Sequence, residues 1–219
     1  MDGDETQSPA APACAVAGLC RARVWVPFLA VTVLGLAADL ASKESVFRSL
    51  MNPPGLDRVI AQRQMVFGPI SSGNMLRQLN LHRHGFGWVS YTLSTNPGIV
   101  FSLPMPRWAV VMFTLGAIGL VLYFLGHSPT RSWSLHIALG MILGGAMGNL
   151  YDRLASCVAL PGMEPIRYQV RDFLDVTVSL GSWQWRYPYL FNVADALLVA
   201  GVAIILLHWL VAGHKTRRA

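Results

Sequence analysis

Residues 134–153 read SLHIALGMILGGAMGNLYDR, and this stretch decides the fold. Its first eighteen residues are almost all apolar or small, which is long enough to cross a bilayer as a helix. Gly144 and Gly148 have the small-xxx-small spacing that allows two helices to approach closely. Asn149 and Arg153, four residues apart, lie at the end of the stretch. The pattern predicts a tightly packed membrane helix that brings polar side chains against a neighbouring helix.

Three further stretches are long and apolar enough to span a membrane. These three lie at about 24–41, 108–125 and 190–211. Together with the stretch described above, at about 134–151, they give four predicted spans. The chain of 219 residues is 53% hydrophobic and only 13% charged, whereas a soluble domain is roughly 25% charged. This balance argues against a soluble enzyme, a disordered chain and a nucleic-acid-binding protein. We therefore expect a mainly α integral membrane protein with four transmembrane helices.

The segments outside the spans predict the topology. An Ala/Pro-rich tail of residues 1–23 is expected to be disordered and cytoplasmic, and a short basic tail, 212–219, ends the chain. An even number of spans places both tails on one side, and their basic flanks indicate the cytoplasm by the positive-inside rule. The segments 42–107 and 152–189 then lie on the outer side. The first span lacks a signal-peptide cleavage site, so we expect it to be retained.

Four carboxylates gather at the outer side of this topology. Asp39 and Asp195 lie within the outer ends of spans, Asp152 directly follows the third span, and Asp172 lies in the second outer segment. Ionisable groups near hydrocarbon are costly and mark candidate functional sites. Two carboxyls in a poorly solvated site share a proton. The ionised one can then activate water while the other protonates an amide carbonyl, which is metal-free peptide hydrolysis.

Five short motifs occur in order along the chain. They are Asp39-x-x-x-Lys43, Asn96-Pro97-Gly98-Ile99-Val100-Phe101, the stretch from Gly144 to Arg153, Val170-Arg171-Asp172-Phe173, and Phe191-Asn192-Val193-Ala194-Asp195. Together they resemble the motifs of the bacterial lipoprotein signal peptidases, also called signal peptidase II. The resemblance covers about residues 24–211.

This resemblance implies an activity and a site. The family are membrane aspartic endopeptidases that remove signal peptides from diacylglyceryl-modified prolipoproteins, cutting before the lipidated cysteine. It implies Asp172 and Asp195 as the catalytic dyad. The supporting residues that it implies are Asp39, Lys43, Asn96, Gly98, Asn149, Asp152, Arg153 and Asn192. It implies no metal and no cofactor, and a small extracytoplasmic β-platform with an arm over the site.

Partners and location follow from the same resemblance. We expect lipid-modified prolipoproteins and membrane lipids as partners, no nucleic acid, and a monomer. The expected location is the bacterial inner membrane, with the active site toward the outer face.

Three features depart from the family pattern. Ala196 stands where the family has Ser or Thr after the second catalytic Asp, the outer segment carries an extra stretch at 51–84, and Asp175 competes with Asp172 for the dyad.

Two other functions also fit parts of the pattern. Lys43 could form a Ser–Lys dyad with a serine such as Ser42. Intramembrane Asp could instead serve a small transporter or proton-relay protein.

Overall fold

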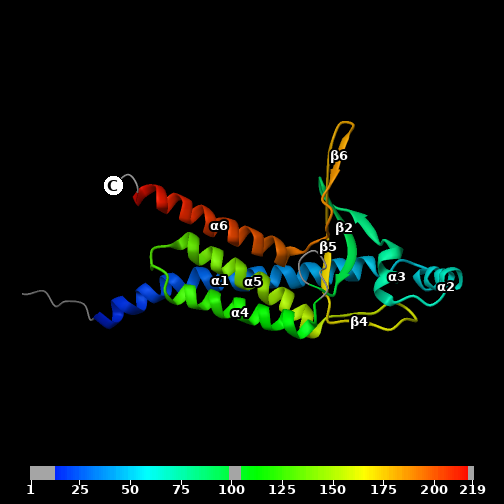
Figure 1. Ribbon diagram of the computed structural model, residues 1–219, viewed down its shortest axis with the longest axis horizontal. Helices are drawn as coiled ribbons and strands as arrows, with labels where there is room; N and C mark the ends of the chain where they lie inside the picture. The colour runs from blue at the N-terminus through cyan, green and yellow to red at the C-terminus, as the bar shows by residue number, and fades with distance from the viewer. Residues whose placement is uncertain (1–12, 99–104, 217–219) are drawn as a thin grey trace, which may run out of the picture.

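Four long helices form a bundle, and a β-sheet lies at one end of it (Figure 1). The computed structural model describes residues 13–98 and 105–216. Within those ranges, four helices are long and apolar enough to cross a membrane. They are α1 (Ala13–Leu50), α4 (Arg107–Gly126), α5 (Trp133–Ala155) and α6 (Val193–Thr216). This confirms the predicted four-span, mainly α architecture.

Helix α1 is longer than the predicted first span at both ends. It begins at Ala13, so residues 13–23, assigned above to the disordered tail, are helical, while residues 1–12 lie outside the described part. At its outer end it continues to Leu50. Residues 42–50 contain neither Gly nor Pro, and the helix ends just before the Asn52-Pro53-Pro54 turn. The extension carries α1 from the bundle into the domain that contains the sheet, which we call the outer domain after its place in the predicted topology.

Glycines on α5 let this helix pack directly against two neighbours. A Cβ at Gly144 would lie 2.9 Å from the carbonyl oxygen of Thr32 on α1. A Cβ at Gly145 would lie 2.5 Å from the carbonyl oxygen of Ala194 on α6. Both distances are shorter than any ordinary carbon–oxygen contact. The predicted packing role of these glycines is confirmed, and α5 is the central helix of the bundle.

The apolar core of the bundle lies between α1, α4 and α5. Phe28 of α1, Leu125 of α4 and Leu139 of α5 are each almost fully buried there. In contrast, α4 and α6 expose many large apolar side chains on their outward faces, which is expected of helices that contact lipid.

The outer domain contains a four-stranded antiparallel sheet in the order β1-β2-β5-β6. Its strands are β1 (His82–His84), β2 (Val89–Asn96), β5 (Val170–Leu180) and β6 (Trp183–Arg186). A second, two-stranded sheet pairs β3 (Cys157–Val158) with β4 (Ile166–Arg167). These sheets confirm the small β-platform that the resemblance implies.

The extra stretch at 51–84 forms a helical cover over this sheet. It contains α2 (Leu56–Phe67), α3 (Ser72–Leu79) and strand β1. Met75, Leu76 and Ile60 are almost fully buried and pack with Phe47 of α1 and Phe173 of β5. The stretch therefore builds a hydrophobic core that joins the α1 extension to the sheet.

The Ser71–Asn74 sequence begins a helix, although its composition indicates a turn. The Ser71 hydroxyl oxygen accepts a hydrogen bond from the backbone N–H of Asn74 at 3.4 Å. This is an N-cap, which satisfies one of the free donors in the first turn of α3. Composition alone does not separate such a cap from a turn, because the same small polar residues serve both.

Replacement of Gly145 by Ala should destabilise the protein, because the added methyl must push α6 away from α5. We expect a loss of about 1–3 kcal/mol, the usual cost of overpacking. The control is Gly119→Ala on α4, where no described atom lies within 4 Å of the new Cβ. Unfolding in detergent micelles measures both. Equal stability of the two variants would contradict the close α5–α6 packing.

Candidate active site

A reciprocal cap at the start of α6 positions Asp195. Asn192 precedes the helix, and its side-chain oxygen accepts a hydrogen bond from the Asp195 backbone N–H at 3.0 Å. In return, the Asp195 carboxylate accepts from the Asn192 backbone N–H at 3.3 Å. This is the capping-box arrangement, which fixes both side chains in the first turn.

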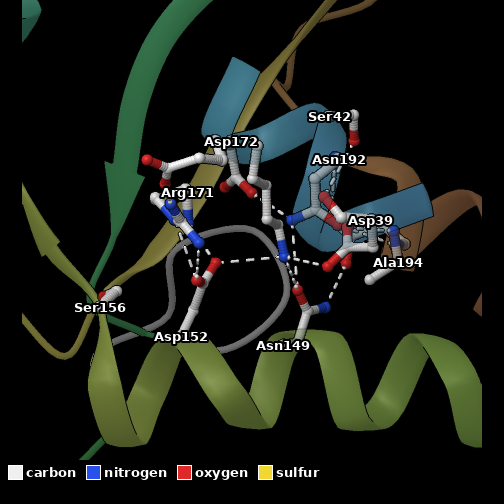
Figure 2. A network of polar contacts seen from close by, with 12 residues as sticks. Asp39, Ser42, Asn149, Asp152, Ser156, Arg171, Asp172, Asn192 and Ala194 are labelled. Carbon is white, nitrogen blue, oxygen red and sulfur yellow. Dashed lines mark hydrogen bonds and ion pairs between the residues drawn. The ribbon is translucent and has the colours of Figure 1, made fainter. Parts of the chain in front are cut away.

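Asp172 reaches the same place from the sheet. It lies on β5, and the Asn192 side-chain amide donates to its Oδ1 at 2.7 Å (Figure 2). Asn192 has no exposed surface and Asp172 is buried. One asparagine side chain therefore contacts both aspartates: its oxygen accepts from the Asp195 backbone, and its nitrogen donates to the Asp172 carboxyl group.

Asn149 of α5 connects the two sides of the site. Its side-chain nitrogen donates to Asp195 Oδ1 at 2.8 Å. Its side-chain oxygen accepts from Asn192 at 3.2 Å and from Lys43 at 3.1 Å. The amide orientation of Asn149 is therefore set by Lys43, which can only donate. The nitrogen of Asn149 is left to face the Asp195 carboxylate.

Lys43 is the centre of the charged network. Its ammonium group donates to Asp39 Oδ2 at 2.7 Å and lies 3.1 Å from Asp152 Oδ2. Asp39, Lys43 and Asp152 have no exposed surface. Asp39 also accepts from the Ala194 backbone N–H at 2.8 Å, which ties α1 to the start of α6. Two buried carboxylates around one lysine anchor three helices at a single point (Figure 2).

Arg171 and Glu44 complete the network, and neither was predicted from the sequence. Arg171 donates to Asp152 through Nε at 3.0 Å and through its backbone N–H at 3.0 Å. Its Nη1 reaches Glu44 at 3.2 Å. The available signal was an arginine between apolar Val170 and the buried dyad residue Asp172, because a buried guanidinium requires a carboxylate partner.

Gly148 leaves the space that Asp39 occupies. A Cβ at this position would lie 2.3 Å from Asp39 Oδ2, the oxygen that receives the Lys43 hydrogen bond. The small-residue face of α5 therefore serves the site as well as helix packing.

Arg153 binds backbone carbonyls. Its Nη1 donates to the Asn149 carbonyl at 3.3 Å and its Nη2 to the Gly98 carbonyl at 3.1 Å. The Gly98 N–H in turn donates to the Asn96 side chain at 2.9 Å. The carboxylate of Asp152, next to Arg153 in the chain, pairs with Arg171 and Lys43. Through its bond to Gly98, Arg153 holds the start of the segment after β2, whose residues 99–104, including the second half of the Asn96–Phe101 motif, lie outside the described part.

Asp175 faces away from the site. It lies three residues beyond Asp172 on β5, and side chains at such spacing point to opposite faces of a strand. Its carboxylate pairs with Arg186 and accepts from the Thr92 hydroxyl at 3.2 Å. These contacts favour Asp172 over Asp175 as the partner of Asp195.

The Ser–Lys alternative does not fit these contacts. The Ser42 hydroxyl donates to the Asp39 carbonyl at 2.9 Å, and Lys43 lies between two carboxylates. Ser42 and Lys43 therefore both have other partners, and the structure shows no contact between them of the kind that a Ser–Lys dyad needs.

Electrostatics distinguish the two carboxyls of the dyad. Burial, with the nearby charge of Asp195, raises the pKa of Asp172 to about 8. Asp172 therefore holds a proton at neutral pH and can donate it. Asp195 lies in the first turn of α6, and its Oδ1 accepts a hydrogen bond from the Asn149 side-chain amide at 2.8 Å. The pair can supply one acid and one base to a substrate.

Comparison with known proteins places this arrangement in a family. A family model described as signal peptidase (SPase) II matches residues 31–211. A lipoprotein signal peptidase of Rhodopirellula baltica is 34% identical over 198 residues, which cover 90% of this chain and 77% of the relative. One from Beijerinckia indica is 41% identical over 117 residues, which cover 51% of this chain and 59% of the relative.

A solved structure has the same fold. It is a bacterial membrane enzyme determined by the in meso method, with a TM-score of 0.53 and 17% sequence identity. The match covers 84% of this chain and 87% of that chain. The family match favours a peptidase over the small transporter or proton-relay protein.

Replacement of Asp172 by Asn should flatten the dependence of stability on pH. Between about pH 4 and about pH 8, folded Asp172 keeps a proton that the unfolded chain has released, because its pKa rises from 3.8 to about 8. The contribution of Asp172 to the free energy of unfolding is therefore largest below about pH 4 and decreases as pH rises toward about 8. Thermal unfolding in micelles should show the fall in the wild type and a smaller one in Asp172→Asn; parallel curves would contradict the raised pKa.

Proposed function

The chain belongs to the signal peptidase II family, and from this premise we propose that it is a membrane aspartic endopeptidase that uses Asp172 and Asp195 as its dyad. Its substrates in this proposal are diacylglyceryl-modified prolipoproteins, cut just before the lipidated cysteine. The observation that carries the dyad assignment is the contact of Asn192 with both residues, the Asp172 carboxyl and the Asp195 backbone. The names of the relatives support the substrate class.

The first chemical step adds water to the scissile carbonyl. The Asp195 carboxylate takes a proton from the water, and the hydroxide bonds to the carbonyl carbon. Protonated Asp172 gives its proton to the carbonyl oxygen, which forms a tetrahedral diol. General acid–base assistance of this kind contributes about 10²–10⁴-fold to the rate.

The second step breaks the peptide bond and restores the dyad. Asp195, now protonated, donates to the leaving amide nitrogen while the C–N bond breaks. Asp172 takes the proton of one diol hydroxyl, and a carboxylic acid product forms. Each aspartate ends in its starting protonation state, so the cycle needs no cofactor.

The supporting residues hold this geometry through the cycle. Asn149 donates to the Asp195 carboxylate in the resting state, and Asn192 donates to Asp172. Ala196 provides no hydroxyl of the kind that the family has at this position. We propose that these two asparagine amides are sufficient to orient the dyad.

We place the chain in the bacterial inner membrane, with the site at the outer face. The start of α1 and the end of α6 lie together at the end of the bundle opposite the sheet (Figure 1). Basic residues flank the spans at that end, including Arg23 and Arg131. The positive-inside rule then assigns that end to the cytoplasm and the Asp dyad to the outer side. In this proposal the chain acts as a monomer that is surrounded by membrane lipids.

The single substitutions Asp172→Asn and Asp195→Asn should each abolish cleavage, because Asn can neither donate an acidic proton nor accept one from water. We expect a loss of at least about 10²–10⁴-fold in kcat. The assay uses purified protein in vesicles with a diacylglyceryl-modified precursor and no ion gradient.

The matched control is Asp175→Asn, on the opposite face of the same strand. It should lose the Arg186 ion pair and keep most of the activity. Full activity of either dyad variant, or equal losses in all three, would contradict the assignment.

The reaction rate should fall as pH rises through about 8, because Asp172 then loses the proton that it donates. The measurement is kcat against pH with saturating precursor. A rate that remains constant well above this pH would show that protonated Asp172 is not the acid.

A further inference from the structure

The β5–β6 hairpin extends beyond the helix bundle. Figure 1 shows it running crosswise to the helices and reaching past α6. Its two strands pair in register from Thr177 opposite Arg186 to Leu180 opposite Trp183. The proposed mechanism uses Asp172, near the start of β5, and leaves this outer part of the hairpin without a role.

The hairpin has one apolar face and one polar face. Residues directly opposite each other in an antiparallel pair share a face. Val178 pairs with Trp185 and Leu180 with Trp183, which forms the apolar face. The polar face comprises Thr177, Ser179, Gln184 and Arg186.

The apolar face is exposed in the isolated protein. Leu180 is 62% exposed, Trp183 55% and Trp185 46%. Exposed apolar surface on an outer strand leads to aggregation unless something covers it. The position of the hairpin at the end of a membrane bundle suggests that the cover is lipid.

A line of aromatic rings joins this face to the fourth membrane span. The rings of Trp185 and Tyr187 lie 6.1 Å apart between centroids, and those of Tyr187 and Phe191 lie 5.9 Å apart. Phe191 is two residues before Val193, where α6 begins. Trp and Tyr are enriched where a membrane protein passes through the headgroup region. The aromatic rings thus run from the apolar face of the hairpin to the residues just before α6.

The polar face of the hairpin lies on the side opposite to Trp183 and Trp185. Arg186 pairs with Asp175 and so lies on the face that also carries Thr177. This ion pair ties β6 to β5 and leaves polar groups on the side turned away from the Trp residues. The hairpin therefore has the amphipathic form of an element that lies flat on a membrane surface.

We propose that the β5–β6 hairpin docks on the outer surface of the phospholipid bilayer that contains the helices of the same chain. The side chains of Val178, Leu180, Trp183 and Trp185 insert among the headgroups. Because Asp172 lies on the same strand, docking also fixes the depth of the dyad relative to the membrane. The docking itself does not require peptidase activity; its effect on depth rests on the proposed function.

Quenching by lipid tests the docking directly. The full chain, with Cys14, Cys20 and Cys157 replaced by Ser, carries a bimane label at Leu180→Cys or, as control, at Ser179→Cys on the polar face. Both proteins are placed in phosphatidylethanolamine/phosphatidylglycerol vesicles that contain nitroxide-labelled lipid. We expect quenching several-fold stronger at position 180 than at position 179.

Other outcomes overturn the proposal. Equal quenching at the two positions, or stronger quenching at 179, means that the apolar face does not meet lipid. Label–label energy transfer at 180 without lipid quenching means that a second copy covers the face instead. Each result is independent of whether the precursor is cleaved.

A second pair of variants tests the role of the Trp residues. Trp183→Gln with Trp185→Gln should reduce quenching at position 180 toward the level at 179, while Gln184→Ala should leave it unchanged. The double Trp variant should also raise KM for vesicle-embedded precursor several-fold without lowering kcat. Unchanged quenching overturns the docking, and unchanged KM with reduced quenching overturns the link to dyad depth. No activity in any protein contradicts the proposed function alone.

Discussion

The ammonium group of Lys43 joins the membrane bundle to the outer domain. It has no exposed surface and lies within 3.1 Å of carboxylate oxygens of both Asp39 and Asp152. Asp39 accepts from the start of α6, and Asp152 accepts from the backbone of β5. Each element that contributes a dyad residue is therefore bound to a carboxylate that Lys43 neutralises. Loss of one member of such a buried set costs about 3–5 kcal/mol, because an uncompensated charge remains.

This arrangement gives the two dyad residues different surroundings. Asp195 begins a helix, faces the Asn149 amide and exchanges capping hydrogen bonds with Asn192. Asp172 comes from a buried strand and receives one amide hydrogen bond from Asn192. Lys43 is already occupied by two other carboxylates, so Asp172 lacks a dedicated cation partner among the described contacts. The raised pKa of Asp172 follows from this burial, and the division into acid and base follows from the raised pKa.

Local patterns in the sequence were sufficient for the four spans and for the close packing of the small-residue face of α5. These features depend on residues near each other in the chain. The pairing of Arg171 with Asp152 and Glu44 was not predicted, because it joins a strand to two helices through contacts that no local spacing encodes. The stretch at 51–84 was unexplained until its apolar residues could be placed against α1 and the sheet.

The central claim is that Asp172 is the carboxyl group that stays protonated at neutral pH. Infrared difference spectroscopy of the protein in vesicles measures this directly through the C=O stretch of a protonated carboxylic acid. We predict that the wild type shows this band at pH 7, that it disappears as pH rises through about 8, and that Asp172→Asn lacks it. A band that persists unchanged in Asp172→Asn, or is absent from the wild type at pH 7, would contradict the account.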